Sequence, residues 1–348
     1  MTKTVKIGKT IIGGGNPVAI QSMTNIKTEY IDKVVEQILA LENAGCDIIR
    51  VAVKDEADAD ALKSLKKRIH IPLVADIHFD YKLAIKSIEN GVDKVRINPG
   101  NIGCDKNVEE VAKAIKDYGV AVRVGSNTGS VEKELLQKYG KNEISLVESA
   151  LKNVAILEKF GVDNIVISTK ASSVPLTVKA YKYLSQKTDY PLHVGVTEAG
   201  TYDSGLVKSS IGIGSLLLDG IGDTIRVSLT ADPVQEVIAA KRILRAVGLD
   251  KNYVEVISCP TCGRTSYDCI GLARKVEEYT ANIKKPIKIA VMGCVVNGPG
   301  EAKDCDLGGA GGTNCCALFK NGEVYKKVSL DEVEKQIKEE IDKLVESK

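Results

Sequence analysis

Three cysteines lie in two loops of the C-terminal third of the chain, with a spacing that suits a metal centre. Cys259 and Cys262 form a CxxC pair in the segment SCPTCGR, and Cys294 follows in the segment GCVVNGPGE. A CxxC pair brings two sulfurs within chelating distance, which suits zinc, an iron-sulfur cluster or a dithiol redox pair. The turn predicted at residues 297–300 would bring Glu301 back toward Cys294, so we expect three thiolates and one carboxylate at one metal.

This ligand set favours iron over zinc, although zinc remains an alternative. A structural zinc site usually has four Cys or His ligands from paired motifs, and the sequence contains no second CxxC and no HxxxH pair. A carboxylate is harder than a thiolate and binds an iron site less tightly, so Glu301 would be the ligand that a substrate displaces. The other candidates for the fourth ligand, which could equally be packing thiols, are Cys269, Cys305, Cys315 and Cys316.

The composition is that of an ordinary globular protein. Its 348 residues suggest about two domains, and a 44% hydrophobic content supports a large core. A net charge of +2, the absence of Trp and only three Phe argue against a nucleic-acid partner. The N-terminus lacks the apolar core of a signal peptide, and no apolar run reaches the roughly 18 residues of a membrane span. We therefore expect a cytoplasmic protein with no membrane partner, whose nine cysteines are thiols or metal ligands.

Residues 17–248 alternate short apolar runs with amphipathic helical segments. The runs that predict strands span residues 18–22, 47–53, 72–78, 93–98, 121–125, 164–169, 191–197 and 223–229. Helical patterns between them include residues 30–44, 81–90, 108–118, 143–160 and 233–247. Eight repeated β-α units of this length predict an α/β fold of the TIM (β/α)8 barrel type. An open doubly wound sheet is the alternative, but no GxGxxG motif follows the first strand. The polar segment 133–142 is interpreted as an insertion in the fifth loop.

We place the barrel domain at residues 1–250 and a smaller α+β domain at residues 251–348. The smaller domain is predicted to contain strands at 253–257 and 287–291, which run into the cysteine loops, and helices at 267–280 and 330–345. A hairpin is expected over residues 317–328, around Asn321-Gly322. The glycine-rich segment 307–314 is interpreted as a flexible loop rather than a phosphate cradle, because no P-loop lysine and serine follow it.

Polar residues recur at the ends of the predicted strands, where a TIM barrel carries its chemistry. The set of candidate substrate-contacting residues is Arg50, Asp76, His78, Arg96, Arg123, Asn127, Lys170, Glu198, Arg226 and Ser228. Five of them are cations that would converge on one barrel mouth. Like charges gathered in this way are unfavourable unless an anion neutralises them, so the pattern predicts a diphosphate ligand.

Two of these residues suggest proton chemistry. His78 pairs with the acid Asp76 and could orient a substrate, transfer a proton or serve only the structure. Glu198 is a carboxylate among cations, in the run GVTEAG. That setting favours the ionised form, which suits a base or an acceptor for a substrate hydroxyl.

Five motifs together resemble the 4-hydroxy-3-methylbut-2-enyl diphosphate synthase family of the non-mevalonate isoprenoid pathway. They are SCPTCGR, GCVVNGPGE, VRINPGN at residues 95–101, VTEAG at 196–200 and GIGDTIRVSL at 220–229. The resemblance covers essentially the whole chain in the bacterial two-domain form. It implies a TIM barrel and a domain like those of sulfite and nitrite reductases, which carries one [4Fe-4S] cluster on Cys259, Cys262, Cys294 and Glu301. One departure is Ser126, where the family usually has an apolar residue before the position of Asn127.

The resemblance also implies a reaction, the reductive ring opening of 2-C-methyl-D-erythritol 2,4-cyclodiphosphate to 4-hydroxy-3-methylbut-2-enyl diphosphate. Two electrons would come one at a time through the cluster from reduced ferredoxin or flavodoxin, while a C–O bond to phosphate breaks and a hydroxyl leaves as water. The strand-end cations, with Asn127 and Ser228, would hold the diphosphate, and Glu198 would handle protons. A homodimer is implied, in which the barrel of one subunit faces the cluster domain of the other.

Two other classes of protein fit parts of the pattern. A zinc-stapled barrel lyase or isomerase that acts on a phosphorylated sugar would need the strand-end cations but would bind zinc. A non-catalytic iron-sulfur sensor would have the cluster but no use for the convergent cations.

Overall fold

Eight parallel strands form a barrel in the first of the two units into which the chain divides, residues 1–249 and 250–348. The computed structural model describes every residue except 295, 297, 313 and 348, and also not the side chains of residues 299 and 301. The barrel strands are β3 (Ala19–Met23), β4 (Ile48–Ala52), β5 (Leu73–Asp76), β6 (Lys94–Arg96), β7 (Ala121–Asn127), β8 (Ile165–Lys170), β9 (His193–Val194) and β10 (Thr224–Ile225). Each lies within one of the eight predicted strand regions or overlaps it.

The two ends of this sheet meet, which distinguishes a barrel from an open sheet. The strand order is β8-β7-β6-β5-β4-β3-β10-β9, and an isolated parallel bridge joins Ile167 on β8 to Leu192, just before β9. The Ile167 N–H also donates to the Pro191 carbonyl at 2.9 Å. The predicted TIM barrel is therefore confirmed, and the open doubly wound sheet is excluded.

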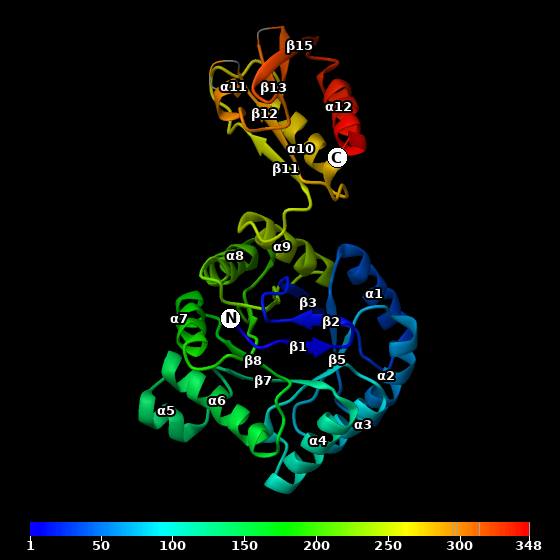
Figure 1. The fold of residues 1–348 in the computed structure, drawn as a ribbon, viewed down its shortest axis with the longest axis vertical. Helices are drawn as coiled ribbons and strands as arrows, with labels where there is room; N and C mark the ends of the chain where they lie inside the picture. The colour runs from blue at the N-terminus through cyan, green and yellow to red at the C-terminus, as the bar shows by residue number, and fades with distance from the viewer. Residues whose placement is uncertain (295, 297, 313, 348) are drawn as a thin grey trace. The chain divides into compact units, whose positions relative to one another are not determined.

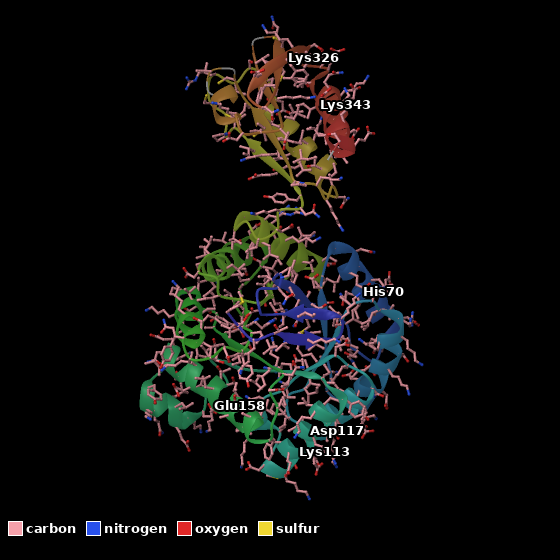
Figure 2. The ribbon with its side chains drawn as sticks, viewed as in Figure 1. His70, Lys113, Asp117, Glu158, Lys326 and Lys343 are labelled. Carbon is pink, nitrogen blue, oxygen red and sulfur yellow. The ribbon has the colours of Figure 1, made fainter. Side chains whose placement is uncertain are left out.

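Helices form an outer ring around the barrel (Figure 1). They are α1 (Ile31–Ala44), α2 (Glu56–Arg68), α3 (Tyr81–Glu89), α4 (Asp105–Tyr118), α5 (Lys133–Tyr139), α6 (Glu143–Lys159), α7 (Val174–Ser185), α8 (Tyr202–Leu218) and α9 (Pro233–Ala246), with a 3-10 turn, η1 (Pro99–Asn101). Apolar side chains at helical spacing face the strands, as Val34, Ile38 and Leu41 do on α1. Charged side chains such as Lys113 and Asp117 of α4 lie on the outside (Figure 2). In the described part of the chain, each helix is too short or too polar for a membrane-spanning segment.

The segment 133–142, expected as an insertion, contains the short helix α5 and then starts α6. Asn142 is the N-cap of α6, and its side-chain oxygen accepts from the Ile144 and Ser145 N–H groups at 3.0 and 3.1 Å. An Asn at this position satisfies helix N–H groups that have no partner within the helix. The polar residues of this segment thus set the start of α6.

An N-terminal hairpin that the sequence patterns did not reveal closes one end of the barrel. It consists of β1 (Val5–Ile7) and β2 (Thr10–Ile12). Its buried side chains pack with the first residues of five barrel strands in one apolar cluster, formed by Val5, Ile7, Ile12, Ala19, Ile48, Val74, Ala121 and Val166. Because these residues start their strands, the hairpin covers the N-terminal end of the barrel. In a TIM barrel the opposite, C-terminal end is the one that carries the active site.

The second unit is an α+β domain built on a five-stranded mixed sheet. Its strands are β11 (Val254–Ser258), β12 (Ile287–Met292), β13 (Leu307–Gly311), β14 (Cys315–Lys320) and β15 (Glu323–Ser329), in that spatial order. The helices α10 (Cys269–Thr280) and α12 (Val333–Ser347) share one apolar cluster with the sheet, and a second cluster lies near α11 (Gly298–Glu301). The predicted hairpin is confirmed, since Asn321 and Gly322 both have positive φ between β14 and β15.

The interpretation of residues 307–314 as a flexible loop is wrong for most of that segment. Residues 307–311 form β13, which is parallel to β12 and antiparallel to β14. A Cβ atom built on Gly308 would lie 2.1 Å from the Phe319 ring. Glycine is therefore needed there because an aromatic ring packs against the backbone, and glycine content alone does not distinguish close packing from flexibility.

Candidate active site

The carboxylate of Asp76 lies among the cations at the C-terminal end of the barrel, which we call the barrel mouth. Asp76 ends β5 and is only 5% exposed. Arg96 Nη1 donates to its Oδ1 at 3.2 Å, Arg50 Nη1 lies 3.6 Å from its Oδ2, and His78 Nε2 lies 3.8 Å from its Oδ1. Burial acts to raise the pKa of Asp76, but Arg50, His78 and Arg96 together hold that pKa well below its usual range. Asp76 is therefore ionised and orients the two arginines.

Two further cations of the mouth are buried without a close ion pair among the described residues. Arg123 is 4% exposed and Lys170 is 8% exposed. Neither side chain has a hydrogen-bond or ion-pair partner within the described residues. Burial lowers the pKa of both groups, and the neighbouring cations lower it further. Burial also lowers the pKa of Arg50 to about 10. The mouth thus holds more positive than negative charge, an arrangement that an anionic ligand would stabilise.

A second buried carboxylate, which sequence reasoning missed, belongs to Glu236 on α9. It is 5% exposed and lies 3.7 Å from Arg226 Nε. Its two oxygens also accept from the Ser22 hydroxyl at 3.1 Å and the Leu229 N–H at 3.0 Å. An acidic residue near the start of a helix is normally explained by its favourable interaction with the helix dipole. Nothing in the local sequence therefore indicates that Glu236 belongs to the site.

Two glycines leave room for the side chains of the mouth. A Cβ atom on Gly125 of β7 would lie 2.1 Å from the Ser168 hydroxyl. One on Gly195 would lie 2.4 Å from the Arg226 carbonyl oxygen and 2.8 Å from Lys170 Nζ. Absence of a side chain at these positions lets Ser168 and Lys170 extend into the mouth from β8.

The remaining predicted residues lie at the rim. Asn127 is the last residue of β7, is half-buried and pairs in register with Lys170. Ser228 is half-buried in the segment that follows β10. Glu198 is exposed, in the segment after β9, and its φ of 51° lies in the left-handed region that a non-glycine residue rarely adopts. Such backbone strain tends to occur at functional sites. The barrel thus gathers all five predicted cations at its C-terminal end. Glu198 is exposed in the segment that follows β9.

The cysteine loops of the second unit lie side by side at one edge of its sheet. β11 and β12 are parallel, with Ser258 opposite Val291, so the loops that follow them leave the same edge. The Cys259 N–H donates to the Val291 carbonyl at 3.0 Å. A Cβ atom on Gly293 would lie only 2.7 Å from the hydroxyl of Thr265, which closely follows the CxxC pair, and 3.5 Å from Cys259 Sγ. Glycine before Cys294 therefore lets the two loops approach each other.

The three thiols of these loops are neighbours but not a closed set of metal ligands. Among the described residues, no three His, Cys, Asp or Glu side chains form a group that could hold a metal ion. Arg264 interacts electrostatically with both Cys262 and Cys294. Hydrogen bonds from the Arg264 backbone and side chain lower the pKa of Cys262, which is exposed. Soft thiolates on adjacent loops are the donors that iron-sulfur clusters and zinc use, so the chemistry fits either. The predicted ligand Glu301 ends α11, and its side chain lies outside the described part of the structure.

The alternative fourth ligands behave mostly as core thiols. Cys269, Cys305 and Cys316 are at most 1% exposed and pack in the apolar clusters of the second unit. Burial raises the pKa of each, that of Cys316 to about 12. A thiol that resists ionisation is a poor metal ligand. Of the four, only Cys315 is half-buried.

Fold and sites together define the class of protein: a TIM barrel with a cationic mouth, joined to an α+β domain that carries cysteine loops. The family model described as the GcpE TIM-barrel domain matches residues 2–241, and that described as the GcpE protein C-terminal domain matches residues 255–343. The chain belongs to the GcpE family.

Several curated relatives are similar over nearly their whole length. A protein of Caldanaerobacter subterraneus subsp. tengcongensis is 60% identical over 346 residues, which covers 99% of this chain and 98% of the relative. One from Geobacillus thermodenitrificans is 54% identical, and the match covers 99% of this chain and 92% of the relative. One from Clostridium perfringens is 54% identical and covers 99% and 98%. All three are named 4-hydroxy-3-methylbut-2-en-1-yl diphosphate synthase (flavodoxin).

Two solved structures resemble this chain over about 71% of its length. Dihydropteroate synthase from Stenotrophomonas maltophilia aligns with a TM-score of 0.52 at 14% identity, over 71% of this chain and 98% of that one. Dihydropteroate synthase from Yersinia pestis aligns with a TM-score of 0.51 at 13% identity, over 71% of this chain and 98% of that one. At this level of identity the likeness concerns the fold only.

The charge balance around Asp76 predicts a large cost for its neutralisation. Asp76→Asn leaves Arg50 and Arg96 buried without their carboxylate, so we expect the free energy of unfolding at pH 7 to fall by about 3 kcal/mol. Denaturant titration of both proteins measures the difference. Asp32→Asn is the matched control, because Asp32 forms an exposed ion pair with Arg68 and should cost less than about 1 kcal/mol. Equal effects of the two substitutions would contradict the central role of Asp76.

The stability difference between the wild type and Asp76→Asn is predicted to depend on pH. Because the pKa of Asp76 is depressed in the folded protein, its stabilisation is complete above the unfolded value of about 3.9 and is lost as the pH falls toward the folded value. The difference between the wild type and Asp76→Asn should therefore be constant from pH 6 to about pH 5 and shrink below about pH 4.

Proposed function

We propose that this protein is an oxidoreductase that converts 2-C-methyl-D-erythritol 2,4-cyclodiphosphate into 4-hydroxy-3-methylbut-2-enyl diphosphate, a step of isoprenoid precursor biosynthesis. The observation that carries the proposal is the surplus of buried cations at the barrel mouth, which suits a diphosphate. The similarity to relatives named for this product supports it. In the balanced reaction, two electrons and two protons are consumed, one C–O bond to phosphate breaks and one water leaves.

The cations of the mouth bind and orient the diphosphate in this proposal. Arg123 and Lys170 have no protein counter-ion among the described residues, so they would neutralise the phosphate oxygens directly. Arg50 and Arg96 are held in place by Asp76 and present their remaining N–H groups. Arg226, beside Glu236, completes the set, with Asn127 and Ser228 as hydrogen-bonding groups. A preorganised set of donors loses little entropy when the ligand binds.

Proton handling is assigned to Glu198. Its carboxylate is exposed at the rim, so it can exchange protons with solvent. The strained backbone at this residue supports a role in positioning the carboxylate. Glu198 would accept a hydrogen bond from the substrate hydroxyl or donate the proton with which that hydroxyl leaves as water. His78, which contacts Asp76 and Arg96, would orient the substrate from the segment that follows β5.

The cysteine loops would hold a [4Fe-4S] cluster. Cys259, Cys262 and Cys294 are assigned as thiolate ligands and Glu301 as the fourth and weakest ligand, since a carboxylate is harder than a thiolate. Arg264 would stabilise the negative charge of the thiolates. When bound, such a cluster supplies electrons one at a time. The electron donor would be a reduced flavodoxin, as the names of the relatives indicate for those proteins, or a ferredoxin.

Metal analysis distinguishes this proposal from the alternative of a zinc-stapled barrel lyase or isomerase. Anaerobically purified protein should contain about four iron and four acid-labile sulfide per chain. Cys294→Ser should lose both. Cys315→Ser is the matched control, because Cys315 is also half-buried and close in sequence but is not assigned as a ligand. Stoichiometric zinc without sulfide would refute the reductase proposal. Loss of the cluster in Cys315→Ser would indicate that Cys315, and not Glu301, is the fourth ligand.

Two substitutions at the mouth should separate binding from chemistry. Arg96→Ala removes a diphosphate contact, so we expect the dissociation constant of the cyclic diphosphate to rise at least tenfold. Glu198→Gln keeps the shape and the cluster, so binding should stay within about threefold while turnover with reduced flavodoxin falls at least a hundredfold. Calorimetry and a steady-state assay provide the two readouts. Unchanged binding in Arg96→Ala would remove Arg96 from the diphosphate site, and wild-type turnover in Glu198→Gln would rule out its proton role.

An apolar stripe on the outer surface of α8 supports the proposed homodimer. Val207, Ile211 and Leu218 are 58, 57 and 72% exposed and lie at helical spacing. Exposed apolar side chains grouped in this way favour association between proteins. The stripe would pair with the same surface of a second chain.

Ile211→Glu should convert the dimer to a monomer, as measured by sedimentation velocity at micromolar concentration. A charge buried at an apolar contact without a partner is strongly unfavourable. Lys113→Glu, on the outside of α4, should leave the dimer intact (Figure 2). A wild-type monomer would refute the homodimer, whereas an Ile211→Glu dimer would place the interface elsewhere.

A further inference from the structure

A polar layer fills the barrel interior one step below the cationic mouth. The interior of a TIM barrel is usually packed with branched apolar side chains. Here the side chains include those of Gln21, Lys94, His193 and Thr224, which are 0 or 1% exposed. The Gln21 amide nitrogen, both His193 ring nitrogens and the Thr224 hydroxyl have no hydrogen-bond partner among the described residues. A layer that served stability alone would be apolar or fully paired.

Lys94 connects this layer to the mouth. It starts β6 two residues before Arg96, so both side chains point into the barrel from the same face of the strand. Its Nζ donates to Gln21 Oε1 at 2.9 Å, which is its one hydrogen bond among the described residues. No carboxylate pairs with it in that part of the chain. The amine therefore lies fully buried directly behind the diphosphate contacts.

The charged groups with the largest effect on Lys94 oppose its protonation. Charged and titratable groups near Lys94 lie on three other strands of the barrel: Arg50 on β4, Arg123 on β7 and His193 on β9. Burial lowers the pKa of Lys94 well below its ordinary value, and Arg123 and Arg50 add to that effect. The pKa of His193 is lowered by burial and by the same cations.

We propose that Lys94 is a second tier of the diphosphate site, uncharged in the free protein and protonated when the diphosphate binds above it. This inference rests on the proposed function of the mouth. The two negative charges of a cyclic diphosphate would cancel the repulsion from Arg50 and Arg123. The ammonium group of Lys94 would then be the stable form, attracted by the ligand and hydrogen-bonded to Gln21. Substrate binding would therefore take up a proton from solvent.

The sign of the pH dependence follows from this coupling. The ligand raises the pKa of Lys94, so a proton is taken up on binding at any pH between the free and the bound values. Affinity for the diphosphate should therefore fall as the pH rises from the free value to the bound value. The cyclic diphosphate is esterified at both ends and lacks a group that titrates near neutral pH, so the proton count reports on the protein.

Calorimetry tests the inference on the full-length protein without an electron donor. The cyclic diphosphate is titrated at pH 8 in two buffers that differ in ionisation enthalpy, which yields the number of protons taken up per binding event. We expect the wild type to take up about one proton more per binding event than Lys94→Met, with about tenfold weaker binding in the variant. Lys66→Met is the control, because Lys66 pairs with Asp93 at the opposite end of the barrel. It should match the wild type.

Each outcome decides the question. Binding by the wild type without proton uptake, or equal uptake in Lys94→Met, would overturn the role of Lys94 while leaving the diphosphate site intact. Absence of any binding by the wild type would refute the diphosphate site, and this inference with it. If Lys94→Met does not fold, Lys94→Gln, which can still donate to Gln21, provides the same comparison.

Discussion

Unbalanced positive charge inside the barrel is the constraint on which the rest of the structure depends. Arg50, Arg123 and Lys170 are buried at the mouth, and the buried carboxylates beside this set are Asp76 and Glu236 in the described part of the chain. Charges of one sign in a medium of low polarity repel strongly. Such an arrangement is unfavourable for the folded protein unless an anion balances the charge.

The rest of the barrel is closed and well packed, and it holds the charged side chains in place against their mutual repulsion. The N-terminal hairpin covers the far end of the barrel with apolar side chains, so the charged layer is supported from below. Glycines at 125 and 195 give the charged side chains their space without displacing a strand. The two carboxylates hold Arg50, Arg96 and Arg226, which lie on β4, on β6 and just after β10. A TIM barrel suits this role because its strand ends point many side chains at one volume.

The second unit carries cysteines of different burial on one small domain, with Cys262 exposed and Cys259 and Cys294 half-buried. Its cysteine loops leave adjacent parallel strands, and glycine at 293 lets them approach. Three further cysteines, Cys269, Cys305 and Cys316, are buried in the core, where burial raises the pKa of each thiol and keeps it protonated. Reactive and structural thiols thus differ in burial rather than in residue type, and burial is a property of the fold.

The sequence by itself determined the repeated β-α units, the cysteine loops and the strand-end cations, because each depends on periodicity or spacing over a few residues. It did not reveal the hairpin at the barrel bottom, the strand formed by residues 307–311, or the arrival of Glu236 and Lys94 at the site. The packing of the hairpin on the barrel, the pairing of residues 307–311 and the positions of Glu236 and Lys94 depend on contacts between separate segments of the chain. Ser22 and Glu236 are separated by 214 residues, and Gln21 and Lys94 by 73. Local patterns carry no information about such partners, so only the tertiary packing within each unit decided them.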